Sequence, residues 1–135
     1  MGFSENIIGK ERGKRWKRLN IRMTDSDSTK FVGVMEKNNY QTLSDTIRNL
    51  IRIGYIDFNK KTTFIEDVES IEFEYDNEYG VKEQQLNVRL NDNELNMANE
   101  LMNIVLCDSL SELVRRLVNI YYIRDVIGRE VFKWK

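Results

Sequence analysis

One short phrase occurs twice in this chain of 135 residues, and the repeat limits what the chain can fold into. RLNIRMTD, at 18–25, is matched by QLNVRLND, at 85–92, with a constant offset of 67 residues. Apolar and polar residues alternate in both copies, which predicts a strand with one apolar and one polar face. The residues of the apolar faces are Leu19, Ile21 and Met23 in the first copy and Leu86, Val88 and Leu90 in the second.

Acidic residues follow each strand, at Asp25 and Asp27 and again at Asp92 and Glu94. Carboxylates are favourable at the positive N-terminal end of a helix, so a helix is expected after each strand. Apolar residues spaced by three and four support the helix of the second copy, whereas the first copy has a weaker stripe. The stripe of the second copy is Leu95, Ala98, Met102 and Val105.

A further helix is predicted in each copy, beginning at TLSD (42–45) and at SLSE (109–112), again 67 residues apart. Both read as capping boxes, in which the hydroxyl accepts from a backbone N–H three residues on and the carboxylate reaches back to the cap. Each copy is therefore strand, helix, helix. One copy cannot bury its own core, because a single short strand leaves both edges unpaired. Two copies can, so we expect an α+β fold in which an antiparallel two-stranded ribbon packs on four helices.

The composition of the chain limits the classes of protein and the kinds of site that can be expected. The chain is 41% hydrophobic and 32% charged, which predicts a folded protein with one modest core or two very small ones. No run of about 18 apolar residues and no secretory signal is visible, so an intracellular protein is expected. With one cysteine, Cys107, and no histidine, neither a disulfide nor a zinc site is expected. No set of nucleophile, base and orienting residue and no glycine-rich phosphate loop is present, so an enzyme is not expected.

The net charge of −1 hides a strong segregation of charge along the chain. Residues 10–18 hold six cations and one acid, whereas residues 64–79 hold seven acids and no cation. The basic block is either a solvated end or an arm that binds phosphates. The acidic block reads as a linker, and the alternation of Ile71, Phe73 and Tyr75 with acids leaves open a strand inside it.

Taken together, the two copies resemble the ribbon-helix-helix transcription regulators of the MetJ/Arc/CopG type. The resemblance rests on RLNIRMTD with TLSDTIRNLI and on QLNVRLND with SLSELVRRLV, and it covers about residues 18–55 and 85–123. Family members are normally homodimers of one unit, and two fused units resemble the tandem versions found in some archaeal viruses. The resemblance implies a cofactor-free regulator that binds double-stranded DNA in the cytoplasm, which is the host cytoplasm if the protein is viral. Repression and activation both remain open.

The resemblance also implies which residues touch DNA. The ribbon would lie in the major groove, and the starts of the second helices would hold backbone phosphates. Arginine pairs with guanine, and asparagine or glutamine with adenine, so the polar face has suitable chemistry. The expected base-reading residues are Arg18, Asn20, Arg22, Gln85, Asn87 and Arg89. The expected phosphate-binding residues are Lys14, Arg15, Lys17, Thr42, Ser44, Ser109 and Ser111. A helix cap alone is the alternative role for each of these hydroxyls.

One feature departs from the family pattern. The turn before the second helix usually carries glycine or asparagine, whereas this chain has Tyr40-Gln41 and Cys107-Asp108 there. Trp16, among the cations, either stacks on a base or packs on the fold.

The expected organisation has five parts, and it leaves a second function open. The apolar tail either packs back on the domain or docks on a second molecule. A homodimer or higher oligomer is expected, especially on DNA, because one ribbon covers few base pairs. An antitoxin-like protein-interaction module is the alternative function. The five parts are a basic arm (1–17), a first unit (18–57), an acidic linker (58–83), a second unit (84–127) and an apolar C-terminal tail (128–135).

Overall fold

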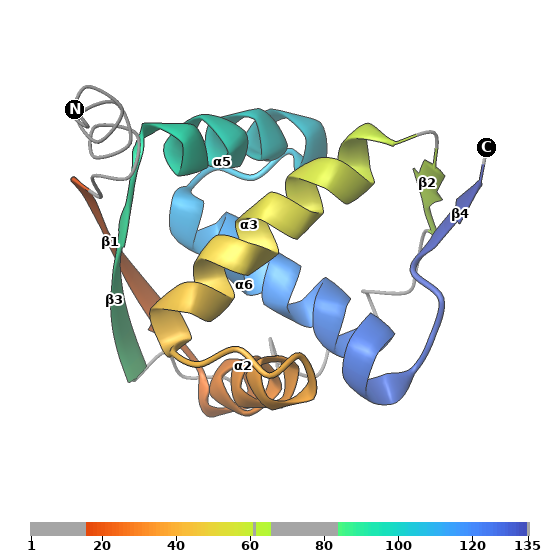
Figure 1. The fold of residues 1–135 in the computed structure, drawn as a ribbon, viewed down its shortest axis with the longest axis horizontal. Coiled ribbons are helices and arrows are strands. Elements are labelled where there is room, and N and C mark those ends of the chain that lie inside the picture. The colour runs from red at the N-terminus through yellow and green to blue at the C-terminus, as the bar shows by residue number, and fades with distance from the viewer. Residues whose placement is uncertain (1–15, 61, 66–83, 135) are drawn as a thin grey trace, which may run out of the picture.

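The fold of the chain comes from a computed structural model that describes residues 16–60, 62–65 and 84–134. It is an α+β fold, as the sequence predicts, and it has two small antiparallel sheets where the sequence analysis expects one ribbon (Figure 1). In the described part of the chain, no helix is long and apolar enough to cross a membrane. The elements are β1 (Lys17–Met23), α2 (Asp25–Lys37), α3 (Leu43–Asn59), β2 (Thr62–Phe64), β3 (Gln84–Leu90), α5 (Asp92–Val105), α6 (Leu110–Tyr122), the π-helix η1 (Ile123–Ile127) and β4 (Phe132–Trp134).

Strands β1 and β3 form an antiparallel ribbon within the one chain, from Lys17 opposite Leu90 to Met23 opposite Gln84. The predicted alternation is seen in its burial. Ile21 and Leu90 are completely buried, and Leu19, Met23 and Val88 nearly so. The ribbon therefore has one face in the core and one face toward solvent.

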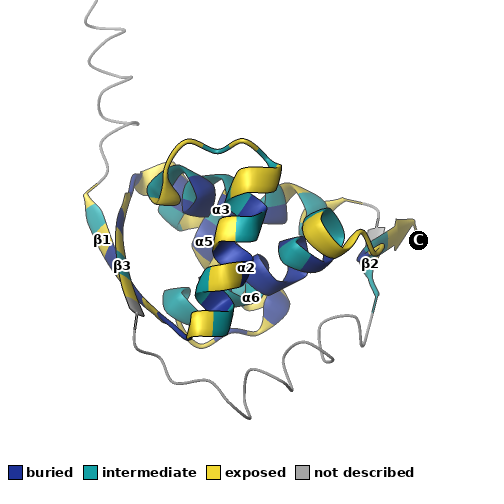
Figure 2. Ribbon diagram, turned by 90° about the horizontal axis from the view of Figure 1, so that it is seen from below, coloured by how far each residue is buried: buried dark blue, intermediate teal, exposed yellow. Residues whose placement is uncertain are grey.

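Helices α2, α3, α5 and α6 lie on the buried side of the ribbon, α2 and α6 against β1 and α3 and α5 against β3 (Figure 1). Helix α3 packs on α5, and α2 packs on α6, so helices from the two copies interlock. Figure 2 shows the buried residues gathered where these helices meet, with exposed residues on their outer sides. The centre of the core joins both copies through Ile47, Ile51, Leu101, Leu113 and Leu117.

The helix starts differ from the sequence prediction. Complete capping boxes are formed by Thr24 with Asp27 and by Asn91 with Glu94, at the starts of α2 and α5. At TLSD and SLSE only the hydroxyl half of the predicted box forms. The physical reason is competition, because the Asp45 carboxylate is paired with Arg48 and Glu112 accepts from the N–H of Asp108 instead.

Each complete capping box also holds an arginine from the other copy. The Arg115 Nε of α6 donates to Asp27 Oδ2 at 3.0 Å. Arg52 of α3 lies 3.9 Å from the buried Glu94 carboxylate. These ion pairs join the start of each first helix to the second helix of the opposite copy.

The turns before α3 and α6 are one residue earlier than the sequence reading placed them. Asn39 and Leu106 adopt the left-handed conformation, with φ of 60° and 58°. Asparagine tolerates this conformation, so Asn39 carries little strain. Leucine does not, and the second copy carries a strained residue.

The C-terminal segment packs back on the domain. Helix α6 continues into η1, and Val131 is buried beyond it. Strand β4 pairs antiparallel with β2 at the opposite side of the molecule from the ribbon (Figure 1). Phe132 makes edge contacts with Phe58 and Phe64, at 5.1 and 5.8 Å between ring centroids. The strand considered for Ile71 to Tyr75 lies outside the described residues.

Candidate nucleic-acid interface

The solvent face of the β1/β3 ribbon is continuous and polar. All six expected base-reading side chains, Arg18, Asn20, Arg22, Gln85, Asn87 and Arg89, are exposed on it. The register brings them together in three cross-strand pairs. These are Arg18 with Arg89, Asn20 with Asn87 and Arg22 with Gln85.

The starts of α3 and α6 flank this face, and their hydroxyls have different partners. Thr42 and Ser109 are N-caps that accept from the backbone N–H of Asp45 and Glu112, at 3.0 and 3.1 Å. The Ser111 hydroxyl donates to the backbone carbonyl of Asn20 at 3.0 Å. Three of the four expected phosphate-binding hydroxyls therefore already take part in the fold.

The fourth hydroxyl, Ser44, lines a cleft of about 300 Å³ between α3 and the ribbon. Three arginines border this cleft, and one of them, Arg48, is a residue that the sequence analysis did not select. Its Nε donates to the carbonyl of Arg89 at 3.2 Å, and its guanidinium pairs with Asp45. The full lining is Arg18, Ser44, Arg48, Asn87, Val88 and Arg89.

A sequence signal for Arg48 does exist. It lies four residues after Ser44, one helical turn further along the same side of α3. The repeat places Arg115 at the corresponding position of the second copy. Arg48 and Arg115 are equivalent in the repeat but have different partners. Arg48 pairs with Asp45, whereas Arg115 pairs with Asp27.

The basic arm is described only at its end. Lys14 and Arg15 lie outside the described residues, and Lys17 is half-buried as the first residue of β1. Trp16 is 54% exposed beside the ribbon, and its Nε1 donates to Asp92 Oδ1 at the start of α5. Trp16 thus contacts the fold through its indole N–H while about half of the residue stays accessible.

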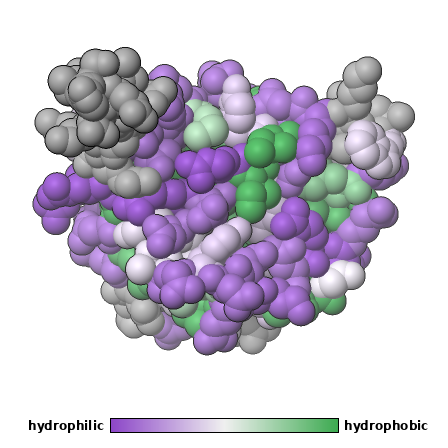
Figure 3. Space-filling view, viewed as in Figure 1, coloured by the Kyte–Doolittle hydropathy of each residue, from purple (hydrophilic) through white to green (hydrophobic). Residues whose placement is uncertain are grey.

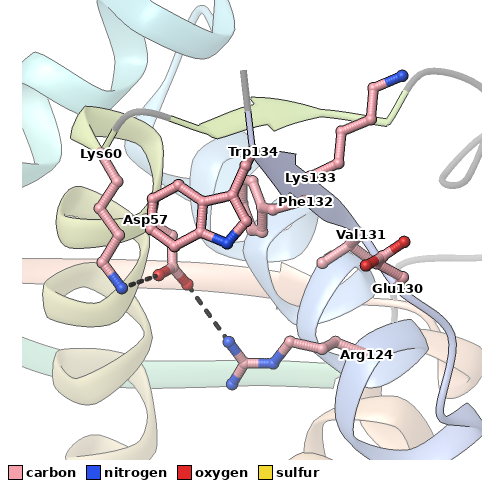
Figure 4. Close-up of a pocket in the computed structure, with 8 residues that line it drawn as sticks. All are labelled: Asp57, Lys60, Arg124, Glu130, Val131, Phe132, Lys133 and Trp134. Carbon is pink, nitrogen blue, oxygen red and sulfur yellow. Dashed lines mark hydrogen bonds and ion pairs between the residues drawn. The ribbon is translucent and has the colours of Figure 1, made fainter.

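A second polar region lies at the far side of the molecule, under β4 (Figure 4). It is a hollow of about 330 Å³ beside Asp57, which pairs with Lys60 at 3.4 Å and Arg124 at 3.3 Å. The hydroxyl of the buried Tyr121 donates to the same carboxylate at 2.7 Å. Because Asp57 brings both cations and the phenol together, the cluster is explained as a stabilising network between α3 and the end of α6.

The surface shown in Figure 3 is largely hydrophilic, with apolar side chains in small separate groups. No family model, curated protein or solved structure matches the chain. The chemistry of the surface therefore has to carry any functional assignment.

Proposed function

We propose that the protein is a tandem ribbon-helix-helix regulator that binds specific double-stranded DNA by placing the β1/β3 ribbon in the major groove. One observation carries this proposal. A two-stranded ribbon presents six side chains with hydrogen-bonding ends on one open face, while its other face is sealed against the helices.

The physical fit supports the assignment. The major groove of B-DNA admits a two-stranded ribbon, and there each base pair shows a distinct set of donors and acceptors. Arg22 and Arg89 occupy equivalent places in the two strands and can each grip a guanine edge in a bidentate manner.

The arm has a different role in the proposal. Lys14 and Arg15 precede the strand, and we assign them to phosphates, where a cation attracts DNA without reading its sequence. The starts of α3 and α6 supply backbone N–H groups, together with the hydroxyls of Thr42, Ser44 and Ser109, to fix the register on the phosphates. The Ser111 hydroxyl is already donated to the Asn20 carbonyl, so it holds α6 on the ribbon instead.

The test compares ribbon and arm variants on a selected operator and on random duplex DNA at equal ionic strength. Arg22→Ala or Arg89→Ala should weaken operator binding by about 1 to 3 kcal/mol and relax preference at one base pair, with little change on random DNA. The double change of Lys14 and Arg15 to Ala should weaken both DNAs alike and reduce the salt slope by at most roughly two.

A matched control is Lys133→Ala, which removes one exposed charge from β4, far from the ribbon. It should leave both affinities unchanged within error. If Arg22→Ala and Arg89→Ala instead weakened operator and random DNA equally, the ribbon would not read bases and the proposal would fail.

Self-association on DNA is part of the same proposal, because six side chains cover only a few base pairs. The candidate contact is Trp134, which is 77% exposed on β4. Deleting the whole tail would also remove the buried Val131, so the cleaner variant is Trp134→Ala. It should keep the fold and reduce cooperative binding to multi-site DNA in a titration followed by gel shift. Unchanged cooperativity would exclude Trp134 as the contact.

A further inference from the structure

The two ends of the ribbon are chemically different, although the fold relates them by a repeat. We define the Arg18 end by the pair Arg18 with Arg89, and the Arg22 end by the pair Arg22 with Gln85. The repeat equates Arg22 with Arg89 and Arg18 with Gln85. The only polar-face position at which the two strands differ is therefore the one that is arginine at 18 and glutamine at 85.

The flanking helices increase the difference. Beside the Arg18 end, the Arg48 Nε donates to the Arg89 carbonyl and its guanidinium pairs with Asp45. Three arginines therefore line one cleft of about 300 Å³ there. In the second copy the corresponding Arg115 is paired with the buried Asp27 at 3.0 Å. The Ser111 hydroxyl, equivalent to Ser44, is bonded to Asn20. Arg48 is thus held beside the ribbon, whereas Arg115 is held at the start of α2, so the two flanks present different groups to DNA.

The charge of the residue before α3 and before α6 also differs, and it too favours DNA on the α3 side. Gln41 precedes α3, whereas the equivalent residue before α6 is the exposed Asp108. A carboxylate at this point repels a DNA phosphate, while a neutral amide does not. The α3 flank is thus more favourable for a phosphate than the α6 flank.

We infer that one chain binds DNA in a single orientation, on a non-palindromic site whose two halves are read differently by Arg18 and Gln85. The inference rests on the proposed function. Arginine favours guanine and glutamine favours adenine, so the Arg18 end selects a guanine where the Arg22 end selects an adenine. A symmetric homodimer of one unit presents two identical ends, whereas this fused chain does not.

The first experiment selects sites from duplexes with a random window of about ten base pairs, roughly one helical turn, so that one ribbon fills it. The wild-type chain should select a non-palindromic site. Arg18→Gln gives both strands the same three polar-face residues, with glutamine at positions 18 and 85. Gln85→Arg also makes the two strands alike, with arginine at both positions. Both variants should select palindromic sites, with adenine at the changed position for the first and guanine for the second.

Affinity on the wild-type site gives a second readout. Replacing the guanine assigned to Arg18 should weaken wild-type binding about ten-fold. The same replacement should have little effect on Arg18→Gln, which has already lost the contact. This comparison does not depend on how the site was selected.

Orientation is measured by directed cleavage. Gln41→Cys and Asp108→Cys, each in a Cys107→Ala background that retains the native circular dichroism spectrum, are coupled to an iron chelate that cuts nearby DNA. The two positions are equivalent in the repeat and exposed. Each conjugate should cut on one side of the site only, and on opposite sides from one another.

The outcomes separate the two proposals. A palindromic wild-type site, with equal cleavage on both sides from each conjugate, would overturn the single orientation and leave ribbon-mediated DNA recognition standing. Selection of no preferred sequence by the wild-type chain would overturn the proposed function itself, and the orientation with it.

Discussion

Asn20 lies opposite Asn87 at the centre of the β1/β3 ribbon, and these two residues hold the same position in the two copies of the repeat. Antiparallel pairing of equivalent residues relates the copies by an approximate two-fold axis that passes between the two asparagines. As a result, the apolar faces of β1 and β3 lie on the same side of the ribbon and pack on the same four helices. The two copies should therefore fold as a single cooperative unit rather than as two domains.

The first prediction tests this shared core. Ile21 is completely buried beneath the ribbon. Ile21→Asp should destabilise the whole chain by more than about 3 kcal/mol, because it removes apolar contacts and buries a carboxylate without a partner. Circular dichroism during thermal unfolding should show loss of helix from both copies at once.

The control for this prediction is the exposed neighbour Arg22. Arg22→Asp introduces the same residue on the solvent face and should change stability by less than about 0.5 kcal/mol. A residual cooperative transition with about half of the helical signal in Ile21→Asp would show that one copy folds alone, contrary to the shared core.

Much of this fold follows from the sequence because a repeat with period-two and helical spacing specifies local structure. The ribbon strands at 19–23 and 86–90 follow from the alternation of apolar and polar residues. The helices after them follow from acidic residues at their starts and from apolar residues spaced by three and four. The polar face could be predicted for the same reason, since alternation fixes which side chains point away from the core.

The rest depends on contacts between distant residues. Asp45 has the correct spacing for a capping box, yet its carboxylate pairs with Arg48. Arg48 and Arg115 are equivalent in sequence, and only the position of Asp27 in three dimensions separates their roles. Strands β2 and β4 are three residues each, too short for a period to show, and they are defined by their pairing.

The second prediction concerns the close packing of α3 at Gly54 against leucines of α5 and α6. A Cβ added at Gly54 of α3 would lie 2.9 Å from Leu117 Cδ2 and 3.3 Å from Leu101 Cδ1. Both leucines are buried and have little room to move. Gly54→Ala should therefore cost about 1 to 2 kcal/mol in the free energy of unfolding, despite the better helix propensity of alanine.

Gly33 of α2 provides the matched control. There the nearest atom to an added Cβ is Tyr122 Cε1 at 3.4 Å, an ordinary contact. Gly33→Ala should stabilise the protein by roughly 0.5 to 1 kcal/mol in urea unfolding. Equal effects of the two substitutions would show that α3 and α6 do not meet closely at Gly54.

The third prediction concerns the strained turn before α6. Leu106 has φ of 58° and is 84% exposed, so its side chain gains little from packing and its backbone is disfavoured. Leu106→Asn should stabilise the chain by roughly 1 kcal/mol, seen as a rise in Tm of about 3 °C.

The control for this prediction is the reverse substitution, asparagine to leucine, at the equivalent turn before α3. Asn39 has φ of 60°, and Asn39→Leu should lower the Tm by a similar amount, since it creates the strain that Leu106 already carries. The prediction requires that the Tm rises in Leu106→Asn and falls in Asn39→Leu. A loss of stability in Leu106→Asn would mean that the Leu106 side chain contributes more than its exposure indicates.

The fourth prediction concerns pH and the network around Asp57. Tyr121 is completely buried, and burial, together with its hydrogen bond to Asp57, raises the pKa of its phenol well above the ordinary value of 10.0. A raised folded-state pKa means that the stabilising contribution is fully present below about pH 10 and is lost as the pH rises above it, where the unfolded chain ionises first.

Tyr121→Phe separates the hydrogen bond from this titration. At pH 7 the variant should be less stable than wild type by about 1 to 2 kcal/mol, because Asp57 loses a donor while it keeps Arg124 and Lys60. Above pH 10 the difference should shrink by up to about 1.4 kcal/mol per pH unit, since only wild type must keep this phenol protonated to stay folded. Urea unfolding at pH 7, 9 and about 10.5 measures the trend, with the half-buried Tyr122 changed to Phe as the control. A stability difference that stayed constant across this range would show that the Tyr121 phenol ionises as readily in the folded chain as in the unfolded one.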